Sequence, residues 1–322
     1  MRLLERAREA GAIFRGGVRA RSLLRSPSGA VSGVEGGEYG PVGAAPRGET
    51  MRHEAPLVIV ADGAGDFTGD EGTKAPSNGV TRRHYFTGVD GPEKDHLHVL
   101  QSDALNGIGA GYVYYLGDGR AAVGGSVWTR AVADRPETLR EGFDRMMGEA
   151  PLDGWLRDAE PASEAESWPM KLGMWGAKRS SQGLMLVGDA GNMGHPVCGE
   201  GYGGAMESGR IAASWAYEAR ARYDYSASLL SGYERQLRRR SAGEYLSGRA
   251  IIKLLPHLEQ LNPLIRACED DPAAGRTLVD VPSGNSPSYA LLKHPAASPA
   301  PFGRSSSARD GEVRLVLYTP RK

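Results

Sequence analysis

One acidic residue and three glycines in the second half of the chain have the types and spacing for ligand chemistry. Asp189 lies in the turn Gly188 to Gly191, which directly follows an apolar run, 184–187, that predicts a buried strand. Gly199, Gly201 and Gly204 come next, before small residues that recur at helical spacing. A helix N-terminus offers unpaired N–H groups and partial positive charge, and glycine lets a flat ligand reach the backbone. This stretch therefore predicts a hydrogen-bond acceptor beside donors that would stabilise an anion.

A flavin fits this combination, because its ribityl chain carries hydroxyls and its isoalloxazine ring can carry negative charge. The three glycines formally spell GxGxxG from Gly199 to Gly204. The dinucleotide fingerprint requires a strand directly before its first glycine. Here the predicted strand ends at Val187. We therefore interpret the stretch as a flavin-ring site and not as that fingerprint.

The elements that must position this stretch follow from hydrophobic patterning and turn residues. The run 57–61 is apolar and β-branched, which predicts a central buried strand that ends at Asp62-Gly63. Alternating patterns predict antiparallel strands, and Asp118-Gly119 predicts a hairpin turn. Besides 57–61, the expected strands are 12–14, 18–24, 30–34, 84–86, 96–100, 111–116, 120–128, 168–176 and 313–318, and the expected helices are 1–10, 136–147, 151–156, 208–222 and 226–247.

Composition narrows the class of protein. The chain has 322 residues with 39 basic and 39 acidic side chains, so its net charge gives no case for nucleic-acid binding. Cys198 and Cys268 are its only cysteines, which predicts neither a disulfide framework nor a metal site and favours a cytoplasmic location. The cluster Arg235 to Arg240 could contact a membrane surface, although a solvated helix face is the favoured interpretation.

The glycine-rich stretch resembles the second flavin-binding motif of FAD-dependent oxidoreductases with the p-hydroxybenzoate hydroxylase-type fold. Their pattern is roughly GDAAG, a few residues, P, two residues and GEG before a helix of small residues. The Asp62-Gly63 turn resembles the ADG motif of the same proteins and lies upstream, in the expected order. The resemblance implies that FAD is the cofactor. The residues it assigns to cofactor binding are Asp62, Gly63, Gly188, Asp189, Pro196, Gly199, Glu200 and Gly201.

A tyrosine-rich segment is similar to the geranylgeranyl reductase family within this group. In that family a motif of the form Y/F-x-W-x-F-P precedes a hairpin, and Tyr112 and Tyr114 stand at its tryptophan and phenylalanine positions. The resemblance implies hydride transfer from reduced flavin to an isoprenoid lipid, with NAD(P)H or another donor as reductant. Tyr112, Tyr114 and Trp175 would line the substrate side. No catalytic residue is assigned, and half-buried sheet aromatics remain the alternative for the tyrosines.

The family pattern begins with a strand, a GxGxxG loop and a helix that hold the ADP pyrophosphate, and none of these precedes residue 57. We therefore expect an α/β (α+β) fold with an incomplete Rossmann-like FAD-binding domain, an inserted antiparallel substrate domain and C-terminal helices. The expected ranges are 1–78 and 183–222 for the FAD part, 79–182 for the substrate part, 223–274 for the helices and 275–322 for a low-complexity tail.

Two other functions stay open at this point. A flavin-dependent monooxygenase would use the same fold, and a non-catalytic remnant would bind isoprenoid or nothing. His195 could donate to the flavin or fill the turn, and Cys198 beside it could act in redox chemistry or as a small buried residue. Membrane association and the oligomeric state are left undecided by these residues.

Overall fold

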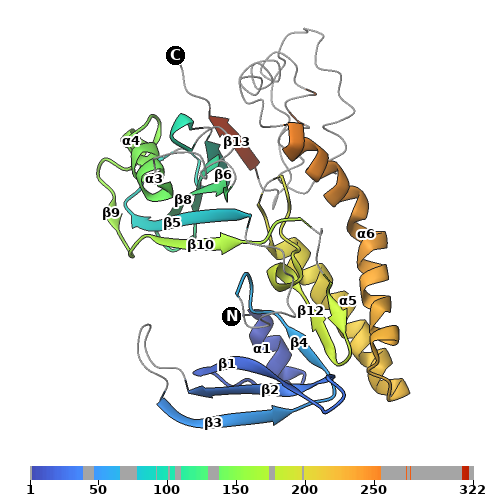
Figure 1. Ribbon diagram of the computed structural model, residues 1–322. Helices are drawn as coiled ribbons and strands as arrows, with labels where there is room; N and C mark the ends of the chain where they lie inside the picture. Colours follow the sequence, from blue (N-terminus) through green and yellow to red (C-terminus); the bar gives the residue numbers. More distant parts are fainter. Residues whose placement is uncertain are drawn as a thin grey trace.

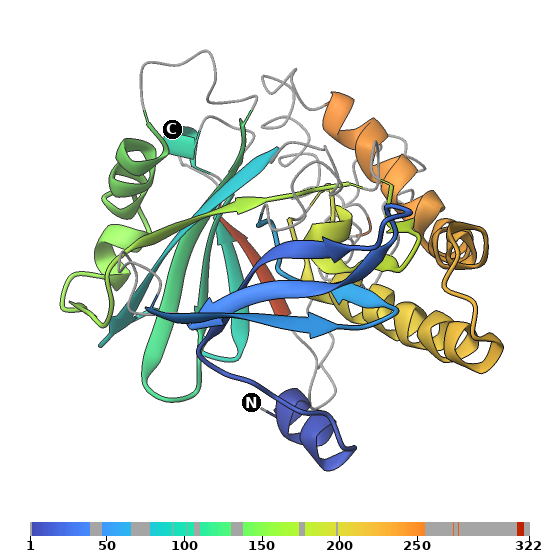
Figure 2. The ribbon, with the colours of Figure 1, turned by 60° about the horizontal axis from the view of Figure 1, so that its bottom comes forward.

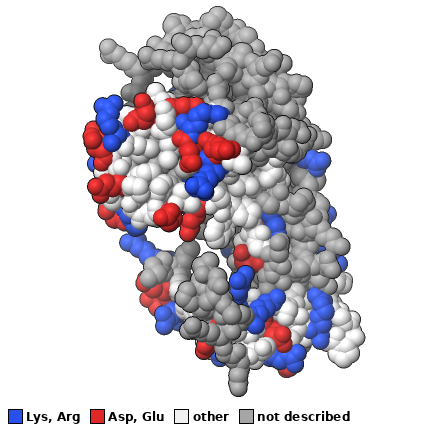
Figure 3. Space-filling view, turned by 60° about the vertical axis from the view of Figure 1, so that its left-hand side comes forward, with Lys and Arg blue, Asp and Glu red and all other residues white. Residues whose placement is uncertain are grey.

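The computed structural model describes residues 2–38, 47–65, 78–91, 93–100, 102–105, 110–129, 138–173, 178–197, 199–254, 273, 276 and 314–318. They form three β-sheets, with a pair of long helices along one side of the molecule (Figure 1). On the face in Figure 3, acidic and basic side chains are interspersed, in keeping with the formal net charge of zero.

The first sheet is a three-stranded antiparallel meander of β1 (Val18–Arg25), β2 (Val31–Glu38) and β3 (Arg47–Glu54). The helix α1 (Arg2–Glu9) precedes it and has no buried residue. The predicted strand 12–14 is wrong. Ile13 and Phe14 are 86% and 55% exposed and have no strand partner among the described residues.

The largest sheet has seven strands in the order β10-β5-β8-β7-β6-β13, with β9 also paired to β5. All its pairs are antiparallel except β13 with β6, so the predicted antiparallel block is confirmed. The predicted late strand is present as β13. The bounds are β5 (Gly79–Thr87), β6 (His96–Leu100), β7 (Ala110–Tyr115), β8 (Arg120–Trp128), β9 (Glu160–Pro161), β10 (Glu166–Met170) and β13 (Arg314–Tyr318).

Local sequence signals explain the elements around this sheet. Gly117 and Gly119 have positive φ angles of 78° and 82°, which shape the turn between β7 and β8. Thr138 caps the helix α3 (Leu139–Met147), since its hydroxyl accepts from the N–H of Glu141 and the Glu141 carboxylate accepts from the N–H of Thr138. The short helices η2 (Asp103–Leu105), α3 and α4 (Leu152–Trp155) cover one face of the sheet, where Val113, Val123 and Phe143 are fully buried.

The third sheet carries the glycine-rich stretch. It contains β4 (Val58–Val60), β11 (Ser180–Ser181) and β12 (Leu184–Leu186), in the order β11-β12-β4. The strand β4 runs parallel to β12 but is the last strand of this sheet among the described residues, and Ile59 is 41% exposed. The prediction of a central strand at 57–61 is therefore wrong for the described part of the chain, because only one edge of β4 is paired.

The 3-10 turn η3 (Gly188–Gly191) follows β12, and then come α5 (Tyr202–Arg222) and α6 (Ala227–Leu254). The two helices lie side by side (Figure 2) and bury Ile211, Leu230 and Leu237 completely. The mixed α/β class, with antiparallel sheets and helices in the C-terminal part, is confirmed.

Candidate functional site

The strand–turn–helix unit is built around the backbone at Gly188. This residue has a φ of +57°, and a Cβ there would lie 3.1 Å from the Cβ of Ala205 on α5. The hydroxyl of Ser208, one turn further along α5, accepts from the N–H of Gly188 at 3.0 Å. Glycine is needed at this position because α5 lies directly against the turn. The turn therefore presents Asp189 at the N-terminal end of α5.

The carboxylate of Asp189 lies against the backbone at the start of this helix. Its Oδ1 is 3.1 Å from the position that a Cβ on Gly201 would occupy. Burial raises the pKa of Asp189, and the nearby Glu200 carboxylate adds to the increase. The backbone N–H and the charge of Lys171 act in the opposite direction. Asp189 and the glycine loop, Gly199 to Gly204, therefore lie next to each other.

Some backbone N–H groups of the glycine loop donate hydrogen bonds within the protein, and others do not. The N–H of Gly199 donates to the carbonyl of His195 at 3.0 Å, and the N–H of Gly203 donates to the Glu200 carboxylate at 2.5 Å. The amides of Glu200 and Gly201 have no acceptor among the described residues. Within the described part of the chain, two donors beside the N-terminus of α5 therefore lack a protein acceptor and can donate to an acceptor atom of a ligand.

The Asp62-Gly63 turn lies beside the same unit. The N–H of Val187 donates to the carbonyl of Val60 at 3.0 Å, which joins the ends of β12 and β4. The buried Lys171 donates from its Nζ to the carbonyl of Gly65 at 3.2 Å, and its backbone N–H donates to the Asp189 carboxylate, so it contacts both motifs. Both turns stand at the carboxyl ends of parallel strands, where ligands of α/β sheets bind. Nothing in the sequence pattern singled out Lys171.

The loop between η3 and α5 is held by α6. His195 Nε2 is 2.8 Å from the Glu244 carboxylate, and His195 Nδ1 accepts from the N–H of Val197. Both ring nitrogens therefore have protein partners, which favours the turn-filling role over donation to a ligand. Pro196 packs against α6 at Gly248. A Cβ on Gly248 would lie 2.5 Å from the Cγ of Pro196. Cys198 lies outside the described residues.

The predicted substrate residues Tyr112 and Tyr114 lie on the face of the large sheet opposite α3. Their rings stack with centroids 5.8 Å apart. The ring of Tyr112 lies over Gly124, where a Cβ would come within 2.1 Å of the tyrosine Cζ. Burial raises the pKa of Tyr112, so this phenol stays protonated. Trp175 lies outside the described residues.

This face continues to the glycine loop. Met170, at the end of β10, pairs with Gly79 at the start of β5, and both lie on the same face as the tyrosines. The Met170 sulfur is 3.9 Å from the position of a Cβ on Gly199. The tyrosine face of the sheet therefore borders the glycine loop at Met170.

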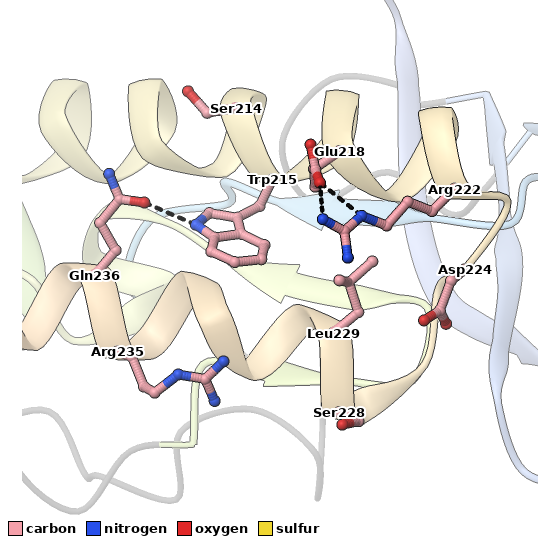
Figure 4. A pocket seen from close by; sticks show the side chains of 9 residues that line it. All are labelled: Ser214, Trp215, Glu218, Arg222, Asp224, Ser228, Leu229, Arg235 and Gln236. Carbon is pink, nitrogen blue, oxygen red and sulfur yellow. Dashed lines mark hydrogen bonds and ion pairs between the residues drawn. The ribbon is translucent and has the colours of Figure 1, made fainter.

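A separate groove of about 570 Å³ lies between α5 and α6. Figure 4 shows the indole of Trp215 donating to Gln236 and the guanidinium of Arg222 paired with Glu218 within it. None of the predicted site residues lines this groove. Among the described residues no cluster of three or more His, Cys, Asp or Glu is placed to hold a metal. None of the described helices combines the length and apolar character needed to cross a bilayer.

No family model matches the chain. Curated relatives do: digeranylgeranylglycerophospholipid reductase 2 of Methanococcoides burtonii is 26% identical over 212 residues, which are 64% of this chain and 50% of that protein. The digeranylgeranylglycerophospholipid reductase of Methanothrix thermoacetophila is 27% identical over 82% of this chain and 62% of that protein. The chain thus spans about half to two thirds of the length of these relatives.

Solved structures share the fold. A geranylgeranyl bacteriochlorophyll reductase-like protein of Thermoplasma acidophilum has a TM-score of 0.69 at 23% identity, with 82% of this chain and 65% of that chain covered. A myxobacterial chondrochloren halogenase of the FAD-dependent class has a TM-score of 0.58 at 18% identity, with 76% and 56% covered. These likenesses confirm the resemblance that the motifs predicted: the chain is related to the geranylgeranyl reductases and has the fold of FAD-dependent oxidoreductases.

Proposed function

We propose that this chain carries the flavin-ring side and the substrate side of an FAD-dependent reductase that saturates carbon–carbon double bonds of isoprenoid lipids. The observation that carries the proposal is the contact between the Asp189 carboxylate and Gly201 at the N-terminus of α5. An acceptor for ribityl hydroxyls and donors for an anionic ring edge then lie side by side. The names of the curated relatives supply the substrate class.

The described residues fit the cofactor. Asp189 would accept hydrogen bonds from the ribityl chain. The amides of Glu200 and Gly201, which have no acceptor among the described residues, would donate to the electron-rich edge of the ring. Asp62 and Gly63 would border the same site at the end of β4. When bound and reduced, FAD would supply the hydride. Either NAD(P)H or another donor would reduce it.

The chain itself would position the lipid and exclude water. Tyr112 and Tyr114 present stacked rings on a face that leads to the glycine loop, so an isoprenoid could lie along it with a double bond near the ring site. In this proposal the ranges 1–78 and 183–222 form the flavin part and 79–182 the substrate part. The buried side chains of α5 and α6 would pack against the strand and turn that carry Asp189 and so fix their position.

A flavin titration tests the cofactor site. The purified chain is titrated with FAD and separately with FMN, while flavin absorbance and fluorescence are followed. We expect saturable binding, and a loss of about tenfold to a hundredfold for Asp189→Asn, because a hydrogen bond to a charged group contributes about 1.5–3 kcal/mol. Asp144→Asn on the exposed side of α3 is the matched control and should bind like the parent chain.

Reduction of a geranylgeranyl lipid with chemically reduced FAD completes the test. The expected product gains two hydrogen atoms per saturated double bond, as measured by mass spectrometry. If the protein retains neither FAD nor FMN after the unbound flavin is removed, the result would instead indicate a non-catalytic protein. Oxygen uptake coupled to hydroxylation of the lipid would favour the monooxygenase.

A further inference from the structure

Arg83 is a half-buried cation in the middle of the tyrosine face. Its Nη1 donates to the hydroxyl of Tyr114 at 3.0 Å, and its guanidinium carbon is 5.6 Å from the ring centre of Tyr85. No carboxylate of the described residues lies within ion-pair distance of it, although Glu166 is directly across on β10. Among the described residues, the Tyr114 hydroxyl is the one hydrogen-bond partner of this guanidinium, which leaves most of its N–H donors open to a ligand.

Further hydroxyl groups lie on the same face of the sheet as this cation. The Oγ1 of Thr81 is 3.3 Å from the Tyr112 hydroxyl, and Ser126 donates to Thr81 at 3.0 Å. Thr81 also donates to the carbonyl of Gly125 at 3.3 Å, so these hydroxyls form a hydrogen-bonded network beside the cation, and the Tyr114 hydroxyl contacts it directly. A guanidinium flanked by hydroxyls is a typical arrangement for a phosphate, because its planar fork binds two phosphate oxygens at once.

The length of β5 determines how far Arg83 lies from the glycine loop. Gly79 lies next to Met170, which borders the glycine loop. It is four residues before Arg83 on β5 and shares its face. Each residue of a strand adds about 3.3 Å, so Arg83 lies roughly 13 Å further along the sheet. If a polar headgroup binds at Arg83, the hydrocarbon chain of the lipid can lie along Tyr112 and Tyr114 and reach the flavin-ring site at Asp189.

We propose that Arg83, oriented by Tyr114 and assisted by the hydroxyls of Thr81 and Tyr112, binds the phosphate of a phosphorylated isoprenoid substrate. This inference rests on the proposed function and extends it, because it assigns the headgroup to Arg83, a residue to which the sequence analysis gave no role. The hydrocarbon chain then lies between the phosphate and the Asp189 loop.

Equilibrium dialysis of the full chain tests this assignment with three probes: geranylgeranyl phosphate, geranylgeraniol and inorganic phosphate. The parent chain should bind geranylgeranyl phosphate at least tenfold more tightly than the alcohol. Arg83→Met should remove this preference while leaving the affinity for geranylgeraniol unchanged. Tyr114→Phe, which keeps the charge but removes its orienting partner, should reduce the preference severalfold. Arg140→Met, on exposed α3, is the matched control and should keep it.

The outcomes separate the two proposals. If both lipids bind and Arg83→Met keeps the parent preference, the phosphate site is wrong while the reductase proposal stands. If neither lipid binds the parent chain, the reductase proposal fails and the headgroup site fails with it. Inorganic phosphate that competes at the concentration of geranylgeranyl phosphate would show a free-phosphate site and overturn the lipid assignment. Should Arg83→Met not fold, Arg83→Lys decides: a severalfold lower preference supports the site, and an unchanged one refutes it.

Discussion

Substituting Gly124 by alanine tests the arrangement of the tyrosine face directly. A Cβ at this position would lie 2.1 Å from Cζ of Tyr112, whereas ordinary contact begins near 3.4 Å. The ring must therefore move by about 1.3 Å, the difference between these two distances. Overpacking of this kind costs about 1–3 kcal/mol, and alanine recovers about 0.5–1 kcal/mol over glycine in a strand. We expect a net loss of roughly 0–2.5 kcal/mol in the free energy of unfolding, with about 1 kcal/mol as the central value.

The neighbouring Gly125 supplies a matched control because its side chain would point to the opposite face. A Cβ there would lie 3.1 Å from Leu105 Cδ1, which needs an adjustment of only a few tenths of an ångström. Gly125→Ala should therefore stay within about 0.5 kcal/mol of the parent. Urea unfolding measures stability, near-ultraviolet circular dichroism reports the tyrosines, and dialysis reports lipid affinity.

Only Gly124→Ala should weaken isoprenoid binding, by about tenfold, because only it displaces a ring that we place against the substrate. Equal lipid affinities of the two variants would refute the assignment of Tyr112 to the substrate side. An unchanged tyrosine spectrum in Gly124→Ala would refute the predicted movement of the ring itself.

Two further substitutions test the flavin side of the fold. Burial raises the pKa of Asp189, so the folded chain binds this proton more tightly than the unfolded chain, and stability should fall as the pH rises from about 4 toward the folded pKa. Asp189→Asn should flatten this part of the curve without loss of stability at pH 7, as measured by urea unfolding across pH, and a steeper curve would contradict the sign. Tyr233 donates to the carbonyl of Leu186 at 2.7 Å in a buried position. Tyr233→Phe should therefore lower the free energy of unfolding by about 1–3 kcal/mol, and a change below 0.5 kcal/mol would mean that this carbonyl finds another donor.

Local signals in the sequence were sufficient for most elements. The Asp118-Gly119 turn fits a tight hairpin, and the alternation on either side of it predicts two paired strands, as the structure shows. The stretch from Leu184 onward likewise predicts a strand, a turn and a helix, and it forms β12, η3 and α5. These predictions succeed because backbone preferences and side-chain periodicity act over a few neighbouring residues. The family motifs added the likeness to flavin-dependent reductases.

Contacts between distant segments were decided only by the tertiary structure. The apolar run at Val58–Val60 looks the same whether its strand is central or at an edge, since the pattern records hydrophobicity and not the number of partners. Lys171 reaches Gly65, and Glu244 reaches His195, through packing that no local pattern contains. Arg83 becomes a candidate phosphate ligand only because the register of β5, β7 and β8 places it among the tyrosines. Sequence thus determined the elements and the family likeness, and long-range packing determined which side chains meet.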